Sequence, residues 1–236
     1  MGLNSECVAL ISGAGRGIGA AAARTLFEAG WVVSLGMRRP AMPDWAAAAP
    51  ERVHCFAYEA TDPGAATGWA ADVMARFGRI DALIANAGVM VPKTAVEVTD
   101  AEMAHLLEVN VQAPRRLAAA CWEPLAASGR GRVVLLGSLS GKRVKSPGSG
   151  AYAVSKFAVV GLAHALRHAG FERGIRAVAV CPGFVATDMA AGITDRPAET
   201  MTQPEDLARV IHMLIDLPNE ASVAEFCVNC QIEESF

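Results

Sequence analysis

The sequence predicts an α/β fold, in which a doubly wound, seven-stranded parallel sheet carries helices on both faces. The apolar runs of the chain are continuous rather than alternating, as expected for strands covered on both sides. Longer helical stretches separate these runs, and crossovers of that length join parallel strands. The predicted strands are Cys7–Ile11, Val32–Leu35, Val53–Phe56, Ala82–Ala85, Val133–Leu136, Ala177–Val180 and Phe226–Val228.

Helical segments are predicted near residues 17–29, 63–77, 100–127, 150–172 and 204–216. The last has a well-marked start, because Pro204 stands early in it and two acids follow in its first turn. No linker rich in Pro, Gly or Ser and no repeat divides the chain, so we predict a single domain over residues 1–236.

Two stretches resist assignment to regular structure. Residues 141–150 are basic and contain glycine, and residues 185–203 are rich in Thr, Asp, Ala and Pro. A loop as long as the second one in a compact domain is usually functional, so we predict a substrate loop there.

The composition is globular, with 53% hydrophobic and 19% charged residues. A net charge of -3 argues against nucleic acid as a partner, and no block of Lys and Arg indicates a membrane surface. No apolar run is long enough to span a membrane.

The histidines form no cluster with acids at metal-ligand spacing, so we expect no metal site. The cysteines are scattered, and no basic stretch precedes the first strand, so we expect a cytoplasmic protein without a secretory signal.

A glycine-rich turn follows the first predicted strand directly and opens the first helix. Glycine permits a tight turn and lets the backbone approach a pyrophosphate, whose charge is stabilised by the helix N-terminus. The spacing G-x-x-x-G-x-G differs from the commonest dinucleotide fingerprint, but the strand–turn–helix context makes it informative. The predicted cofactor-binding residues of this turn are Gly13, Gly15, Arg16, Gly17, Ile18 and Gly19.

The end of the second predicted strand indicates which nicotinamide cofactor is bound. An acid there would bind the ribose 2′-hydroxyl of NAD, whereas an arginine would accept the 2′-phosphate of NADP. The strand ends without a carboxylate, and Arg38 follows Met37, where the acid would fall. Because Arg16 also lies on the adenosine side, these two guanidinium groups favour NADP(H) over NAD(H).

Tyr152 and Lys156 lie four residues apart in a helical segment that is mostly apolar. At this spacing two side chains share one helix face, one turn apart. A neighbouring ammonium favours the phenolate, so we expect the pKa of Tyr152 to be lowered toward the working range. This pair is therefore a candidate for proton transfer.

Six features in this order resemble the short-chain dehydrogenase/reductase family in its single-domain form. Each feature alone is common, whereas six in order at fitting spacings are specific, and together they cover nearly the whole chain. The resemblance implies a Rossmann-type fold for one dinucleotide-binding and catalytic domain. The features are the glycine turn at 12–19, Asn86-Ala87-Gly88, Asn110, Ser138, Tyr152 with Lys156, and Cys181-Pro182-Gly183 with Thr187.

The resemblance implies roles for these residues. Tyr152 would be the catalytic acid/base and Ser138 would bind the substrate oxygen. Lys156 would hold the cofactor ribose and lower the tyrosine pKa, and Asn110 would anchor a relay water. A homotetramer or dimer would form on helix faces near 100–127 and 150–172 and on the last strand. Further cofactor contacts are implied for Asn86, Ala87, Gly88, Pro182, Gly183, Val185 and Thr187.

The chain departs from the family pattern in two places. The family serine usually lies 13 residues before the tyrosine, whereas Ser138 lies 14 before and Ser140 lies 12 before. The Ser-x-x-Gly pattern favours Ser138, and Ser140 stays an alternative. At the end of the third predicted strand the family usually carries an Asp that contacts the adenine, whereas this chain has Glu59 and Ala60. The cofactor contact expected at Ala60 is therefore based only on its position in the chain.

Pro114 lies four residues after Asn110 in a predicted helix. Because proline has no N–H, the carbonyl of Asn110 loses its helical partner there and a kink is expected. One hypothesis is that this carbonyl binds the relay water, and the other is that Pro114 only bends the helix.

The function predicted from these residues is an NADP(H)-dependent oxidoreductase. It would transfer hydride between the nicotinamide and the carbonyl or alcohol carbon of a small, modestly hydrophobic substrate. A catalytically silent NADP(H)-binding sensor is the alternative, and an epimerase or dehydratase would need a larger substrate region. Lys142, Arg143 and Lys145 either meet an acidic substrate or lie on a solvated loop. Candidate substrate walls are Met90, Val91, Ser140, Val144, Phe184 and residues 188–203.

Overall fold

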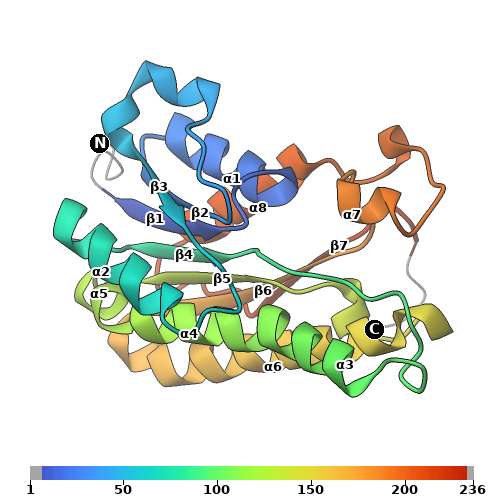
Figure 1. Cartoon of the computed structure of the whole chain (residues 1–236). Helices are drawn as coiled ribbons and strands as arrows, with labels where there is room; N and C mark the ends of the chain where they lie inside the picture. Colours follow the sequence, from blue (N-terminus) through green and yellow to red (C-terminus); the bar gives the residue numbers. More distant parts are fainter. Residues whose placement is uncertain (1–6, 233–236) are drawn as a thin grey trace.

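The computed structural model describes residues 7–232 and contains one parallel sheet in the order β3-β2-β1-β4-β5-β6-β7 (Figure 1). This confirms the predicted fold class. Each strand lies within two residues of its predicted bounds. The strands are β1 (Val8–Ser12), β2 (Val32–Met37), β3 (Val53–Ala57), β4 (Ala82–Ala85), β5 (Arg132–Leu136), β6 (Arg176–Pro182) and β7 (Glu225–Val228).

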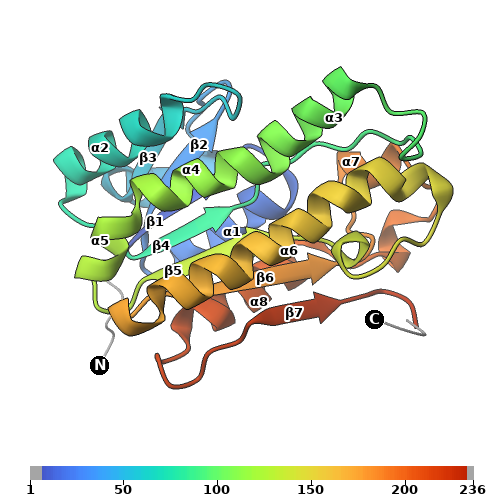
Figure 2. The same cartoon turned by 90° about the horizontal axis from the view of Figure 1, so that it is seen from below.

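Helices cover both faces of the sheet, as Figures 1 and 2 show from two sides. On one face α1 packs beside α8, and on the other face lie α2, α4, α5 and α6. The helices are α1 (Gly17–Glu28), α2 (Ala65–Phe77), α3 (Asp100–Leu107), α4 (Ala113–Ala120), α5 (Trp122–Ala127), α6 (Gly150–Gly170), α7 (Asp188–Ala191) and α8 (Pro204–Asp216).

The two faces of the central strands bury different side chains. Leu10 of β1 and Leu83 of β4 belong to the core under α2, α4, α5 and α6, whereas Ile11 and Ile84 belong to the core under α1 and α8. All four are fully buried. Burial of each such side chain stabilises the fold by about 1.5–3 kcal/mol, which explains the continuous apolar runs in the sequence.

The helix predicted over residues 100–127 is divided in the structure. It begins as α3, capped by Thr99, and passes through a π-helical turn at Glu108–Gln112 before α4 and α5. In that turn the N–H of Ala113 donates to the carbonyl of Glu108, five residues back. Pro114 follows in the first turn of α4. The local irregularity expected from the proline is therefore present, and the form it takes is a π-helical turn.

The two predicted loops contain short helical turns. Residues 139–141 and 147–149 form 3₁₀ turns, and α7 lies inside the segment 185–203. Two more 3₁₀ turns, at residues 44–48 and 50–52, were not expected from the sequence.

The expectation about a secretory signal concerns the first six residues, which lie outside the described part of the chain. Within residues 7–232, no helix is both long enough and apolar enough to cross a membrane.

A buried polar network joins β2, β3 and α2 away from the carboxyl ends of the strands. Nδ1 of His54 lies 2.9 Å from the hydroxyl of Ser34, which accepts a hydrogen bond of 2.7 Å from the indole of Trp69. On its other side, His54 Nε2 lies 2.9 Å from the carboxylate of Asp72. Burial lowers the pKa of His54 below its usual value of 6.5, although the neighbouring Asp72 opposes that shift.

We predict that His54 makes the protein less stable in mild acid. Its folded-state pKa lies below the unfolded value, so the unfolded chain binds the proton first as pH falls, and the free energy of unfolding decreases below about pH 6.5. His54→Asn keeps an acceptor near Ser34 but cannot titrate. The fall in the urea midpoint between about pH 7 and about pH 5 should be smaller in this variant. Equal falls in the two proteins would contradict the prediction.

Candidate active site

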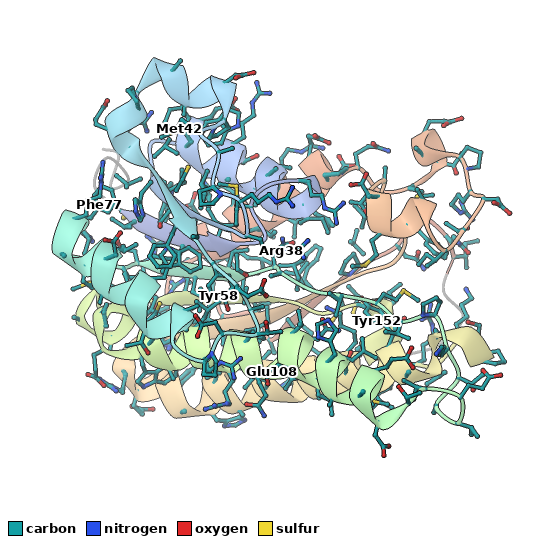
Figure 3. All side chains as sticks on the ribbon, viewed as in Figure 1. Arg38, Met42, Tyr58, Phe77, Glu108 and Tyr152 are labelled. Carbon is teal, nitrogen blue, oxygen red and sulfur yellow. The ribbon has the colours of Figure 1, made fainter. Side chains whose placement is uncertain are left out.

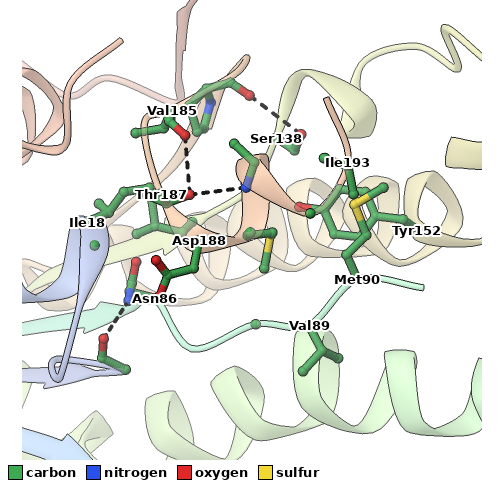
Figure 4. Close-up of a pocket in the computed structure, with 18 of the residues that line it drawn as sticks. Ile18, Asn86, Val89, Met90, Ser138, Tyr152, Val185, Thr187, Asp188 and Ile193 are labelled. Atoms are coloured by element: carbon green, nitrogen blue, oxygen red, sulfur yellow. Dashed lines mark hydrogen bonds between the residues drawn. The ribbon is translucent and has the colours of Figure 1, made fainter. Parts of the chain in front are cut away.

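A cleft of about 1610 Å³ lies at the carboxyl ends of the parallel strands (Figure 4). Its walls come from the turn after β1, the ends of β2, β4, β5 and β6, the start of α6, and the segment 182–195. The cleft brings together all of the predicted site residues except Gly19 and Asn110, which lie behind its walls. Of the candidate substrate walls, Met90, Ser140 and Phe184 line it, whereas Val91 and Val144 do not.

The glycine turn takes a shape that requires glycine at Gly13, Gly17 and Gly19. Gly17 has φ of +55°, in the left-handed region. A Cβ at Gly19 would lie 2.4 Å from the carbonyl oxygen of Gly13, so Gly19 lets α1 pack onto the turn. No side chain caps the N-terminus of α1, where Arg16 is the N-cap residue. The N–H groups of its first turn are therefore available to an anion in the cleft.

The segment after β4 is fastened to this turn. The hydroxyl of Ser12 accepts hydrogen bonds of 3.1 Å from the backbone N–H groups of Asn86 and Ala87. The side chain of Asn86 donates to the carbonyls of Ser12 and Gly13. Asn86 thus supports the shape of the turn. The sequence includes Ser12 in the glycine turn but does not reveal this role, because its only signal is its position at the end of β1.

Arg16 and Arg38 have different surroundings. Arg16 Nη1 lies 2.5 Å from a carboxylate oxygen of Asp188 in α7, and both side chains are largely exposed. This ion pair joins positions 172 residues apart, so the sequence alone gave no sign of it. Arg16 also lines the cleft. Arg38 is exposed and lines the cleft at the end of β2 (Figure 3).

Tyr152 and Ser138 face each other across the cleft. The hydroxyl of Ser138 lies close to the phenol of Tyr152, and it receives a hydrogen bond of 3.0 Å from the backbone N–H of Ser140. This geometry places Ser138, rather than Ser140, beside the tyrosine. Burial raises the pKa of Tyr152 above its usual value of 10.0, and the neighbouring Ser138 opposes that shift only in part.

The expectation that Lys156 lowers the pKa of Tyr152 is therefore wrong, because burial raises that pKa instead. The ammonium of Lys156 lies 5.5 Å from the centre of the tyrosine ring, too far to offset the loss of water around the phenol. Lys156 is itself buried, with 6% exposure, and donates a hydrogen bond of 2.7 Å to the carbonyl of Leu136. Burial lowers the pKa of Lys156 to about 8.

Asn110 fastens the wall behind the cleft. Its side chain is 2% exposed and donates to the carbonyl of Val89 and to the hydroxyl of Ser155, both at 2.9 Å. Its Oδ1 accepts from the N–H of Val89 at 2.9 Å. Ser155 in turn donates to the carbonyl of Tyr152 at 2.7 Å. Asn110 thus links the segment after β4 to the helix of Tyr152, a link through Ser155 that sequence reasoning missed.

The segment after β6 is held by hydrogen bonds of Thr187 and Ser138. Thr187 caps α7 and donates to the carbonyl of Val185, and the carbonyl of Pro182 accepts from Ser138 at 3.5 Å (Figure 4). Ala60 lies at the other end of the cleft, where its carbonyl accepts from Arg116. Among residues 7–232, no group of His, Cys, Asp and Glu has the arrangement of a metal site.

Comparison with known proteins identifies related sequences and structures. The family described as short chain dehydrogenase matches residues 7–198. Agropine synthesis reductase of Rhizobium rhizogenes is 39% identical over 235 residues, which cover 98% of this chain and 54% of that protein. The chain thus spans about half the length of the first curated relatives it matches.

Two solved structures with bound cofactor share the fold. An alcohol dehydrogenase from the archaeon Thermococcus sibiricus, complexed with 5-hydroxy-NADP, has a TM-score of 0.82 and 26% identity, covering 94% of this chain and 95% of that one. A metagenomic short-chain oxidoreductase in complex with NADP has a TM-score of 0.80 and 28% identity, covering 97% of this chain and 99% of that one.

We predict that Asn110→Leu destabilises the protein by about 2–5 kcal/mol, because it leaves buried groups of Val89 and Ser155 without partners. Urea unfolding would measure the loss. Gln112→Ala, an exposed change in the same π-helical turn, is the matched control and should stay within about 0.5 kcal/mol of the wild type. Similar losses in the two variants would mean that the bonds of Asn110 do not stabilise this wall.

Proposed function

This chain belongs to the short-chain dehydrogenase family of oxidoreductases, and on that premise we propose that it reduces or oxidises a small molecule with NADP(H). The reacting group would be the carbonyl or alcohol of a modestly hydrophobic substrate. One observation carries the proposal: the phenol of Tyr152, the hydroxyl of Ser138 and the ammonium of Lys156 meet in the cleft that the glycine turn borders.

The residues of the cleft fit a dinucleotide. The uncapped N-terminus of α1 offers N–H groups to a pyrophosphate, and Gly15 and Gly17 leave room for close approach. Lys156 is a buried ammonium with three N–H donors, one of which goes to Leu136, so its charge suits a ribose hydroxyl nearby. When bound, the nicotinamide would supply or accept the hydride.

Tyr152 would move the proton that accompanies the hydride. Because burial raises its pKa, the phenol keeps its proton at neutral pH and can donate it to the carbonyl oxygen of a substrate during reduction. In the reverse direction the phenolate would take that proton from the alcohol. Ser138, whose hydroxyl lies close to the phenol, would donate to the same substrate oxygen and hold it in place.

Lys156 and Asn110 would complete the proton path. An ammonium whose pKa is about 8 keeps most of its charge near neutral pH and would stabilise the phenolate that remains after transfer. The carbonyl of Asn110 lacks a proton donor at position 114, which is proline, and the π-helical turn displaces the neighbouring bonds. This supports the hypothesis that it binds a relay water.

The preference for NADP(H) is also a proposal. Arg38 stands at the end of β2 without a competing carboxylate beside it in the sequence, and a guanidinium suits a 2′-phosphate. NADP in one structural neighbour and 5-hydroxy-NADP in the other agree with this choice.

The proposed assembly follows from the resemblance, and the proposed location follows from the scattered cysteines. We propose a homo-oligomer, a tetramer or a dimer, in the cytoplasm. Val154 and Phe157 of α6 are exposed on the single chain, on one of the helices that the resemblance assigns to the contact.

We predict that Tyr152→Phe lowers kcat by a factor of about 10²–10⁴, because it removes the proton that the reaction needs. Loss of NADPH absorbance with a panel of aldehydes and ketones would measure turnover, and fluorescence titration would check that NADPH still binds. Tyr58→Phe removes the same atom from the chain's other tyrosine and should leave kcat within about twofold. Binding of NADPH without turnover of any panel member in the wild type would favour the sensor.

We also predict that NADPH binds at least about tenfold more tightly than NADH, as expected for one or two charge-assisted hydrogen bonds to a 2′-phosphate. Arg38→Gln should weaken NADPH binding by about that factor and leave NADH binding nearly unchanged. Calorimetric titration of both cofactors is the measurement. Comparable affinities in the wild type would rule out the preference.

A further inference from the structure

An ion pair outside the cleft fastens the loop that follows β5 to the edge of the sheet. Nζ of Lys142 lies 2.5 Å from one carboxylate oxygen of Glu225 in β7, and the other oxygen lies 2.6 Å from Nε2 of His164 in α6. The side chains of Lys142 and Glu225 are only 25% and 23% exposed. One carboxylate thus connects the loop, the last strand and the helix of Tyr152.

These contacts hold a strand that has little other support. Within residues 7–232, β7 pairs with β6 alone and forms the edge of the sheet (Figure 2). Burial alone would raise the pKa of Glu225, but the hydrogen bonds to Lys142 and His164 lower it below its ordinary value of 4.5. The bond to Glu225 raises the pKa of Lys142 above 10.5. Both members of the ion pair are therefore charged at neutral pH.

Lys142 ends the short turn that Ser138 begins. Ser138 is the N-cap residue of the 3₁₀ turn at 139–141, and Lys142 is its C-cap residue. The hydroxyl of Ser138 accepts from the N–H of Ser140 at 3.0 Å, and its carbonyl accepts from the N–H of Gly141 at 2.8 Å. An interaction that holds Lys142 in place therefore also restrains Ser138, four residues earlier.

The same turn lies directly on the helix of Tyr152. A Cβ at Gly141 would lie 2.6 Å from the carbonyl oxygen of Lys156, so the turn and α6 are in close contact there. The turn is thus held against α6 on one side, and the ion pair with β7 holds its outer end. Release of that end would allow the hydroxyl of Ser138 to move relative to the phenol of Tyr152.

We propose that Glu225 is a positioning residue for the reaction, because through Lys142 it holds the turn that begins at Ser138 against α6. This inference rests on the proposed function, in which Ser138 binds the substrate oxygen. Lys142 and Glu225 lie outside the walls of the cleft, so they act through Ser138 and not by contact with substrate or cofactor. Their loss should therefore affect turnover and leave the binding of NADPH unchanged.

Removal of either member of the ion pair tests this role. Lys142→Met keeps most of the side-chain volume without the charge, and Glu225→Gln keeps the shape of the acid. Each should lower kcat on a panel of aldehydes and ketones by about three- to thirtyfold, because a small displacement of a group that orients the substrate is costly. Each should leave the Kd of NADPH within about twofold of the wild type. The double variant should lose no more than the more affected single variant, because both changes break the same link.

Two further variants are the controls. Lys142→Arg keeps a cationic donor for Glu225 and should keep kcat within about twofold of the wild type. Glu123→Gln removes the carboxylate of another ion pair, 2.7 Å from Arg173 and outside the cleft, and should also stay within about twofold. An arginine variant as impaired as Lys142→Met, equal losses in Glu225→Gln and Glu123→Gln, or NADPH binding that weakens in parallel with kcat would overturn the inference.

Hydrogen exchange of the turn separates this inference from the proposed function. The amides of Ser140 and Gly141 are bonded to Ser138, and mass spectrometry of a peptide that contains them follows their exchange. In Glu225→Gln they should exchange about three- to tenfold faster than in the wild type, with β1 unchanged. That result supports the role of Glu225 even if no carbonyl compound is reduced, an outcome that would count against the oxidoreductase alone. Unchanged exchange of the turn would overturn the role even if the wild type reduces the panel.

Discussion

The reversal of strand order between β1 and β4 is the constraint on which the site depends. From β1 the chain adds β2 and β3 on one side of the sheet and then returns to add β4 on the other. At such a point the connections after the strands diverge and leave a crevice at their carboxyl ends. The glycine turn after β1 and the segment after β4 border that crevice, and Ser12 fastens one to the other.

Buried polar groups give this crevice its chemistry, and they require partners. A buried ammonium or phenol is stabilised only if its lost water is replaced. Lys156 donates a hydrogen bond to the carbonyl of Leu136, and the hydroxyl of Ser138 lies close to the phenol of Tyr152. Their pKa values move in opposite directions because the same desolvation penalises the charged form of each, the phenolate in one case and the ammonium in the other. The protein alone thus favours a protonated tyrosine beside a lysine that keeps most of its charge near neutral pH.

The sheet and most of the site residues could be predicted from the sequence, because continuous apolar strands and glycine turns are local patterns. The predictions that failed depend on the three-dimensional surroundings of each residue. The pKa of Tyr152 was expected to fall because a spacing of four brings Lys156 onto the same helix face, but burial outweighs a cation 5.5 Å from the ring. The ion pair of Arg16 and Asp188 joins segments at opposite ends of the chain. Pro114 revealed an irregular helix but not its π-helical form.

The separation of charges along the cleft follows from the same topology. Each cationic group sits after a particular strand, Arg38 after β2 and Lys145 in the loop after β5, so the sheet itself sets the distance between them. Between these ends the cleft is lined by Ser138, Tyr152 and Lys156, together with apolar side chains such as Met90 and Leu139. A dinucleotide with a 2′-phosphate would be anchored by charge at the end of the cleft that Arg38 borders. Its uncharged nicotinamide would then reach the middle of the cleft, where burial keeps the phenol of Tyr152 protonated.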